Sequence, residues 1–102
     1  MRVAAERGLR WAAEGYSGSG LEDATKQRAR KIASGAELTA DHVRRMHSFF
    51  ERHADGRGDA PPSKVTPWDV AWALWGGDPG RRWADRKSDE LERWEREGRP
   101  DD

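Results

Sequence analysis

The sequence of 102 residues lacks cysteine, net charge and long apolar runs. The absence of cysteine excludes a disulfide framework, a thiolate metal site and a thiolate nucleophile, and it fits a reducing compartment. The balance of 19 basic and 19 acidic side chains argues against a histone-like protein and against a strongly acidic DNA mimic. Without a membrane-spanning run or a signal-peptide core near Met1, the sequence predicts a protein of the cytosol or of a particle assembled there.

Alternating runs of β-branched residues are also absent, so the sequence gives no signal for strands. It is rich instead in tryptophan, with six indoles in a chain that is 37% charged and 34% hydrophobic. Each indole removes a large apolar surface from water when it is buried. We therefore predict an all-α fold, a compact bundle of four to five short helices with a tryptophan-rich core. Such a core should provide a stability of roughly 5 kcal/mol or a little more.

Three of the six tryptophans stand at i, i+4 and i+7 of one predicted helix, which is the spacing of a single helix face. They are Trp68, Trp72 and Trp75. Thr66 is a candidate N-cap before Pro67 at the first helical position, and Gly76 is suited to close the helix in the left-handed conformation. This face is either a core or a recognition surface for a peptide or stacked bases, and the burial of most aromatic stripes favours the core. The expected core residues are Val43, Met46, Phe50, Ile32 and Trp83.

The sequence is organised in four parts. These are an N-terminal helix over residues 1–14, a Gly/Ser linker over 15–20, a helical domain over 21–97 and a disordered acidic tail over 98–102. Gly8 weakens the N-terminal helix, which we expect to contact a partner outside the core. Inside the domain, Thr39 is a candidate N-cap for a helix that ends near His53, before a polar loop over residues 55–62. Asp78 is a candidate N-cap for the last helix, with a proline at its first position.

Metal binding and catalysis are the functions that the sequence supports least. His42, His47 and His53 are spaced five and six residues apart, and neither spacing is the i, i+4 pair that holds one ion on a helix. No nucleophile elbow, phosphate loop or metal-binding motif is present. We therefore expect no metal, no cofactor and no enzymatic activity.

Two kinds of interaction surface remain open. Trp94 lies late in a highly charged predicted helix that a small core does not reach, so it is a candidate for an exposed aromatic that binds a protein partner. Leu91 on the same helix and Trp11 on the N-terminal helix complete this candidate surface. The stripe of the last helix consists of Trp83, Lys87, Leu91 and Trp94.

The alternative is a nucleic-acid surface, built from basic groups on three predicted helices. The groups are Arg28, Arg30 and Lys31, then Arg44 and Arg45, then Arg81 and Arg82 with Arg86 and Lys87. If the fold brings them together, they form a phosphate-binding surface despite the neutral total charge. The competing interpretation is an ordinary solvated face, because carboxylates are interleaved with the third group.

Two blocks of sequence carry a family resemblance. The first is RARKIASG over residues 28–35 followed by LTADHVRRMHSFFERH over 38–53, and the second is WALWGGDPGRRWA over 72–84. In this order they resemble a small domain that tailed bacteriophages and prophages encode, alone or attached to virion-related proteins, and the resemblance covers roughly residues 21–87.

The resemblance implies a phage or prophage origin and a non-enzymatic role, and it supplies no active site. We expect an interaction module that binds a virion component or a host protein, in the cytoplasm of the bacterial host or associated with the virion. A small nucleic-acid-binding protein is the alternative.

Overall fold

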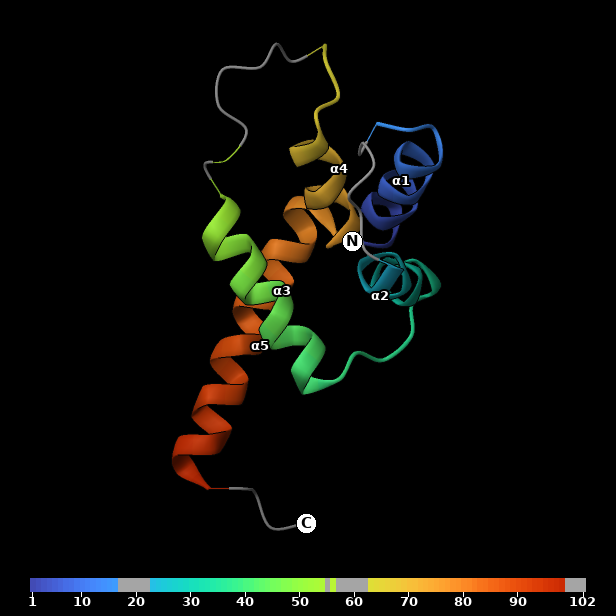
Figure 1. The fold of residues 1–102 in the computed structure, drawn as a ribbon. Coiled ribbons are helices and arrows are strands. Elements are labelled where there is room, and N and C mark those ends of the chain that lie inside the picture. The colour runs from blue at the N-terminus through green and yellow to red at the C-terminus, as the bar shows by residue number, and fades with distance from the viewer. Residues whose placement is uncertain (17–22, 55, 57–62, 99–102) are drawn as a thin grey trace.

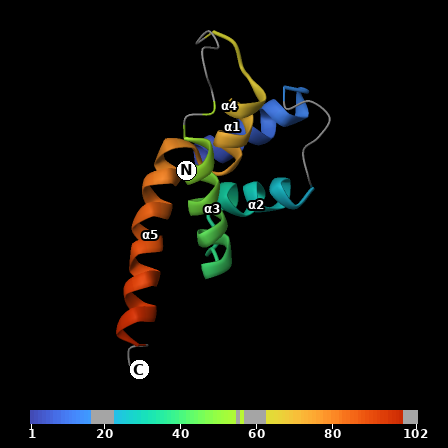
Figure 2. The ribbon, with the colours of Figure 1, turned by 60° about the vertical axis from the view of Figure 1, so that its left-hand side comes forward.

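A computed structural model describes residues 1–16, 23–54, 56 and 63–98, and this part of the chain is helical without a strand (Figure 1). The helices are α1 (Arg2–Ala13), α2 (Asp23–Ser34), α3 (Ala40–His53), α4 (Pro67–Leu74) and α5 (Gly77–Glu97). The prediction of an all-α bundle is confirmed. One helix is not short, since α5 has 21 residues and extends past the rest of the bundle (Figure 2).

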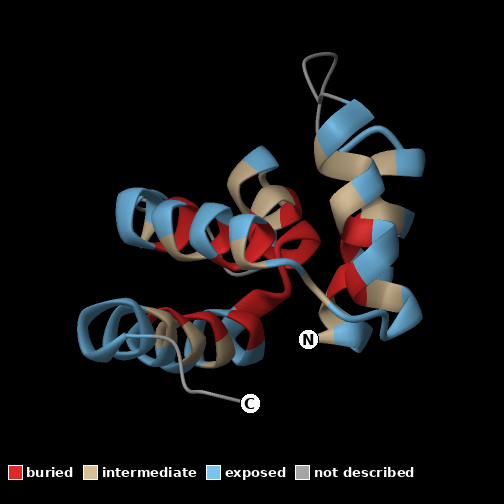
Figure 3. Ribbon diagram, turned by 90° about the horizontal axis from the view of Figure 1, so that it is seen from below, coloured by how far each residue is buried: buried red, intermediate tan, exposed pale blue. Residues whose placement is uncertain are grey.

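The helices pack in two groups that α4 joins. On one side α1 lies against both α2 and α4, and on the other side α3 lies against α5. Helix α4 also contacts α5 and α2, so it bridges the two groups. Figure 3 shows the buried residues on the sides of the helices that face one another. The last buried residue of α5 is Ser88, so the final two turns of this helix extend beyond the core.

The aromatic core forms as the tryptophan spacing predicts. The ring of Trp72 meets Phe50 edge to face, with 4.8 Å between the ring centroids, and stacks on Trp68 at the same separation. Trp75 stacks on Phe49 at 5.3 Å. The predicted partners Val43, Met46, Phe50 and Ile32 are all buried, and Trp68 and Trp83 are partly buried against the cluster.

The N-terminal helix packs on the core, a point that the sequence leaves open. Ala5 is fully buried in the main cluster, and Gly8 is buried against α4. A Cβ atom on Gly8 would lie 2.7 Å from the backbone nitrogen of Leu74, closer than any non-bonded contact allows. Glycine at this position therefore permits the close approach of α1 to α4, a role that its low helix propensity does not reveal.

Two of the three predicted N-caps are confirmed. The Thr39 hydroxyl accepts a hydrogen bond from the backbone N–H of His42 at 3.1 Å. Thr66 forms a capping box, in which its hydroxyl accepts from the N–H of Asp69 at 3.2 Å and the Asp69 carboxylate accepts from the N–H of Thr66 at 2.8 Å. Gly76 follows α4 with a φ of 112°, in the left-handed region as predicted.

The prediction that Asp78 caps α5 is wrong. Helix α5 begins at Gly77, two residues before the predicted first position Pro79, and Gly76 is its N-cap. The Asp78 carboxylate instead accepts a hydrogen bond from the indole Nε1–H of Trp72 at 2.8 Å. This bond satisfies the polar edge of a buried ring and ties α4 to the first turn of α5.

Three predicted segments lie largely outside the described residues. Of the linker, the structure describes Gly15 and Tyr16, which form a turn after α1, where the N–H of Tyr16 donates to the carbonyl of Trp11. Residues 17–20 of the linker, residues 99–102 of the tail and most of the loop over residues 55–62 are not described.

Candidate functional site

An open groove of about 800 Å³ lies between α5 and the segment that leads from α2 into α3. One wall is the stripe that the spacing of α5 predicts. The members of that stripe are Trp83, Lys87, Leu91 and Trp94, and Glu90 joins them on this wall. The opposite wall comes from Met1 and from residues 35–38, 40 and 43. The sequence indicated the first wall, but it gave no sign of the second, because Met1 and Leu38 reach the groove only through packing.

The length of α5 explains why the groove is open. At 1.5 Å per residue, α5 is about 31 Å long, whereas α3 is about 21 Å long. Leu91 and Trp94 therefore stand on the part of α5 that extends beyond Ser88, its last buried residue. Leu91 is half-buried, and Trp94 is 38% exposed. A large aromatic ring at the end of an apolar groove is a typical anchor for a partner's side chains.

The side chains that line the groove carry one net negative charge. The Lys87 ammonium and the Glu90 carboxylate form an ion pair on α5, at 3.1 Å. Glu37 adds a second carboxylate from the opposite wall. Beyond the groove, an ion pair between Arg44 and Glu95 links α3 to the last turns of α5. The groove is therefore apolar at its centre and slightly acidic at its edge.

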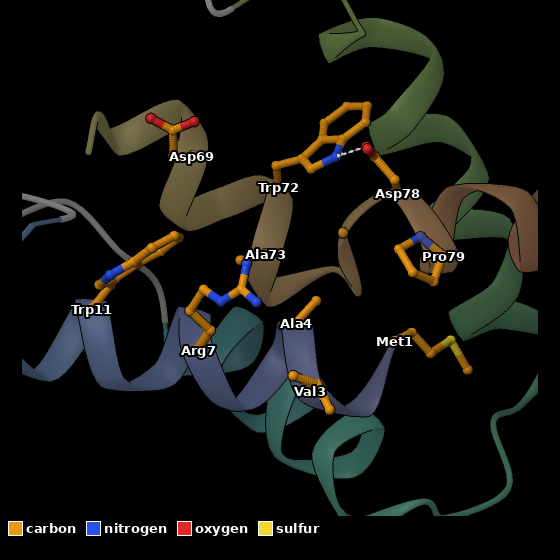
Figure 4. A pocket seen from close by; sticks show the side chains of 11 residues that line it. Met1, Val3, Ala4, Arg7, Trp11, Asp69, Trp72, Ala73, Asp78 and Pro79 are labelled. Carbon is orange, nitrogen blue, oxygen red and sulfur yellow. Dashed lines mark hydrogen bonds between the residues drawn. The ribbon is translucent and has the colours of Figure 1, made fainter. Parts of the chain in front are cut away.

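Trp11 lies elsewhere, so the structure does not bring the three predicted partner-binding residues together. It lines a pocket of about 340 Å³ between α1, α4 and the start of α5 (Figure 4). The guanidinium of Arg7 lies 5.8 Å from the centre of the Trp11 ring. The two carboxylates of this pocket already accept hydrogen bonds, Asp69 in the capping box and Asp78 from Trp72. Its polar groups therefore hold the fold together.

A second candidate surface is a basic pocket of about 400 Å³ between α2 and α3. Its arginines are Arg28, Arg44, Arg45 and Arg52, and its other lining residues are Thr25, Asp41, Ser48 and Trp75. The Arg28 guanidinium lies 5.7 Å from the centre of the Trp75 ring. Two of the four arginines are paired, Arg45 with Asp41 at 2.8 Å and Arg44 with Glu95. The pocket therefore brings four arginine side chains together, but carboxylates neutralise part of their charge.

The fold unites only part of the three basic groups. Arg28 of the first group meets Arg44 and Arg45 of the second, whereas Arg30, Lys31, Arg81 and Arg82 do not line the pocket. Arg81 instead lies over the Trp72 ring, 5.9 Å from its centre. The sequence reasoning missed Arg52 because it stands alone in its stretch. Helical spacing was the available signal, since positions 44, 48 and 52 share one face.

His42 is a buried histidine beneath this basic pocket. Its side chain is 6% exposed, and its Nε2 atom has no hydrogen-bond partner among the described residues. The ring meets Trp75 edge to face, with 6.1 Å between the ring centroids. Burial lowers the pKa of His42, and the positive charges of Arg28 and Lys31 lower it further, against the smaller opposite effect of Asp41. His42 is therefore held in its neutral form.

The lowered pKa predicts a loss of stability in mild acid. Below the ordinary histidine pKa of about 6.5, His42 binds a proton more readily in the unfolded chain than in the folded chain. The contribution of His42 is therefore fully present above about pH 6.5 and is lost as the pH falls. Urea unfolding should show that His42→Leu loses less stability than the wild type between pH 7.5 and pH 5.5. Equal losses in the two proteins would contradict the burial of a neutral His42, and the exposed His53→Gln serves as the control.

Comparison with known proteins adds no identity. No family model, curated protein or solved structure matches this chain. Among the described helices, none is both long and apolar enough to cross a bilayer. The functional proposal consequently depends on the geometry of the two surfaces and on the sequence blocks described above.

Proposed function

We propose that this chain is a non-enzymatic protein-interaction module of phage or prophage origin, whose groove along α5 binds a virion component or a host protein. The observation that carries this proposal is the groove itself, where Leu91 and Trp94 continue the stripe of Trp83 beyond the core. The resemblance of residues 28–53 and 72–84 to a domain of tailed phages supports the origin. An apolar groove with an exposed indole suits binding better than it suits reaction chemistry.

The occupant that fits this groove is an amphipathic helix of the partner. Helices dock into hydrophobic grooves through apolar residues at i, i+3, i+4 and i+7, and the straight wall of α5 presents its side chains at the same spacing. Because Lys87 already pairs with Glu90, the Glu37 carboxylate is the group that a partner can pair with, and we expect a lysine or arginine beside the partner's apolar anchors. A second copy of this chain is the competing occupant that the experiment must separate.

The test is capture from nuclease-treated extracts of infected bacteria, with the wild-type chain and the double variant Leu91→Asp, Trp94→Ala. We expect one protein to bind the wild type at least thirtyfold more tightly, which is about 2 kcal/mol, because the variant removes the anchor and places a charge in the groove. Tyr16→Ala is the matched control, since Tyr16 is a 46% exposed aromatic that does not line the groove. The captured protein should bind through an amphipathic helix.

A partner that binds the double variant as well as it binds the wild type would contradict the proposal. Thermal unfolding of each variant verifies that it is folded. Sedimentation of the chain alone separates the competing occupant, because self-association that the double variant abolishes would mean that a second copy fills the groove.

The basic pocket favours nucleic acid as a second candidate partner. Four arginine side chains line this pocket and offer cations for phosphates, whereas the buried Trp75 ring already stacks on Phe49. The same capture without nuclease tests this alternative, with Arg44→Glu, Arg45→Glu as the variant. This candidate would replace the groove on three results together. The arginine variant would no longer capture nucleic acid, whereas Leu91→Asp, Trp94→Ala would still capture it. The affinity of the wild type for nucleic acid would also fall steeply with salt.

A further inference from the structure

Three side chains with metal-binding atoms meet where α3 packs against α5. His47 and Glu51 stand one turn apart on α3, and Asp85 comes from α5. The His47 Nδ1 atom lies 3.1 Å from the Asp85 carboxylate, and its Nε2 atom lies 3.7 Å from the Glu51 carboxylate. One donor atom from each residue lies within 4.8 Å of the other two. None of the three residues lines the groove or the basic pocket.

We propose that His47, Glu51 and Asp85 bind a divalent transition-metal ion, with Zn²⁺ as the representative. An imidazole nitrogen with two carboxylate oxygens is a ligand set that Zn²⁺, Co²⁺ and Ni²⁺ accept, whereas Mg²⁺ and Ca²⁺ prefer oxygen alone. Three protein ligands leave the remaining coordination position to water. A neutral imidazole and two carboxylates carry two negative charges, which balance the charge of the ion.

One ion binds only one ring nitrogen of His47, so with Nδ1 and Asp85 as the first ligands the Glu51 carboxylate has to move from its place near Nε2. Bond lengths of about 2.0–2.1 Å in a tetrahedral site place the ligand atoms roughly 3.3 Å apart. The Glu51 side chain is 67% exposed and able to rotate toward His47, and the Asp85 side chain is 47% exposed. The His47 ring is the fixed member, because it is 32% exposed and lies against Asp85. The packing of α3 on α5 therefore places His47 and Asp85 together, and rotation of the exposed Glu51 side chain completes the site.

A proton is the competing occupant of this cluster. If His47 is protonated, it forms ion pairs with the two carboxylates and needs no metal. The i, i+4 spacing of His47 and Glu51 is the one sign of the cluster in the sequence, and the spacings between histidines do not reveal it. Asp85 lies 34 residues further along the chain than Glu51, so only the fold brings it to them. A bound metal would cross-link the two helices and stabilise the folded chain, because the unfolded chain does not hold the three ligands together.

The test is titration of the metal-free, untagged chain with Zn²⁺ near neutral pH, in competition with a chromogenic chelator. We expect one ion per chain, an increase in the melting temperature, and visible absorption bands of Co²⁺ when that ion replaces Zn²⁺. His47→Gln and Asp85→Asn should each weaken binding at least tenfold. His53→Gln is the matched control, because it removes an exposed histidine of the same helix that lies outside the cluster.

Binding that His47→Gln leaves unchanged would overturn the proposal, and so would the absence of any Zn²⁺-dependent change in the melting temperature of the wild type. Glu51→Gln keeps the test decisive if a substitution on the half-buried His47 prevents folding, because the Glu51 side chain is mostly exposed. It should also weaken binding at least tenfold, and unchanged binding by this variant would count against the site.

Discussion

Replacing Trp72 with alanine is expected to lower the free energy of unfolding by about 3–5 kcal/mol, the range for removing a buried tryptophan or phenylalanine ring. Trp72 is 8% exposed and contacts three other aromatic rings, those of Phe49, Phe50 and Trp68. Its loss opens a cavity at the point where α4 meets α3. Since the whole domain should be stable by roughly 5 kcal/mol, the variant should be largely unfolded on mild heating.

Urea unfolding followed by circular dichroism measures this loss, and two further variants show its origin. Trp72→Phe keeps an aromatic ring and loses the hydrogen bond to Asp78, so it should cost far less, about 1 kcal/mol. Trp94→Ala removes an indole that is 38% exposed and should change the stability little. If Trp72→Ala unfolded at the same urea concentration as the wild type, the tryptophan core described here would be wrong.

The second large effect concerns Gly8, where leucine is expected to destabilise the chain by about 3 kcal/mol. A Cβ atom at this position would lie 2.7 Å from the backbone nitrogen of Leu74 and 3.0 Å from the carbonyl carbon of Ala73. Backbone atoms cannot rotate away, so α1 must move off α4, which puts the cost at the upper end of the range for overpacking. Part of the apolar surface that α1 covers on α4 then returns to water.

The sign of the change in unfolding free energy shows whether α1 packs against α4. Leucine forms helices better than glycine by about 0.8 kcal/mol, so Gly8→Leu would stabilise an N-terminal helix that stood free of the core. Arg10→Leu is the matched control, because it places the same side chain on an exposed position of α1 and should change the stability by less than about 0.5 kcal/mol. Equal or higher stability of Gly8→Leu in urea unfolding would show that α1 does not pack against α4.

The sequence predicted those features that depend on local spacing. The i, i+4, i+7 tryptophans lie in the core, and Thr39 and Thr66 cap their helices, because these interactions join residues a few positions apart. Asp78 shows where such reasoning fails. It has the composition of an N-cap before proline, but the buried indole N–H of Trp72 has a stronger need for an acceptor.

Features that depend on contacts between distant segments were not predictable. From the sequence, Gly8 is only a residue of low helix propensity, and its role in packing depends on the nearby backbone of Leu74. The groove combines a predictable wall with an unpredictable one. The stripe of α5 was evident from its spacing, whereas the wall that contains Met1 and Leu38 depends on how three helices pack. The charges of the basic pocket were likewise visible, but their pairing with Asp41 and Glu95 was not.

The most direct test of the central claim is site-specific cross-linking from the groove. A photo-reactive phenylalanine derivative replaces Trp94, and the chain is irradiated in extracts of infected bacteria, with the same derivative at Tyr16 as the control. The groove account predicts one cross-linked virion or host protein from position 94, joined through an amphipathic helix that carries a basic residue, and no such product from position 16. Cross-links from position 94 only to nucleic acid or to a second copy of the chain, or no cross-link at all, would contradict it.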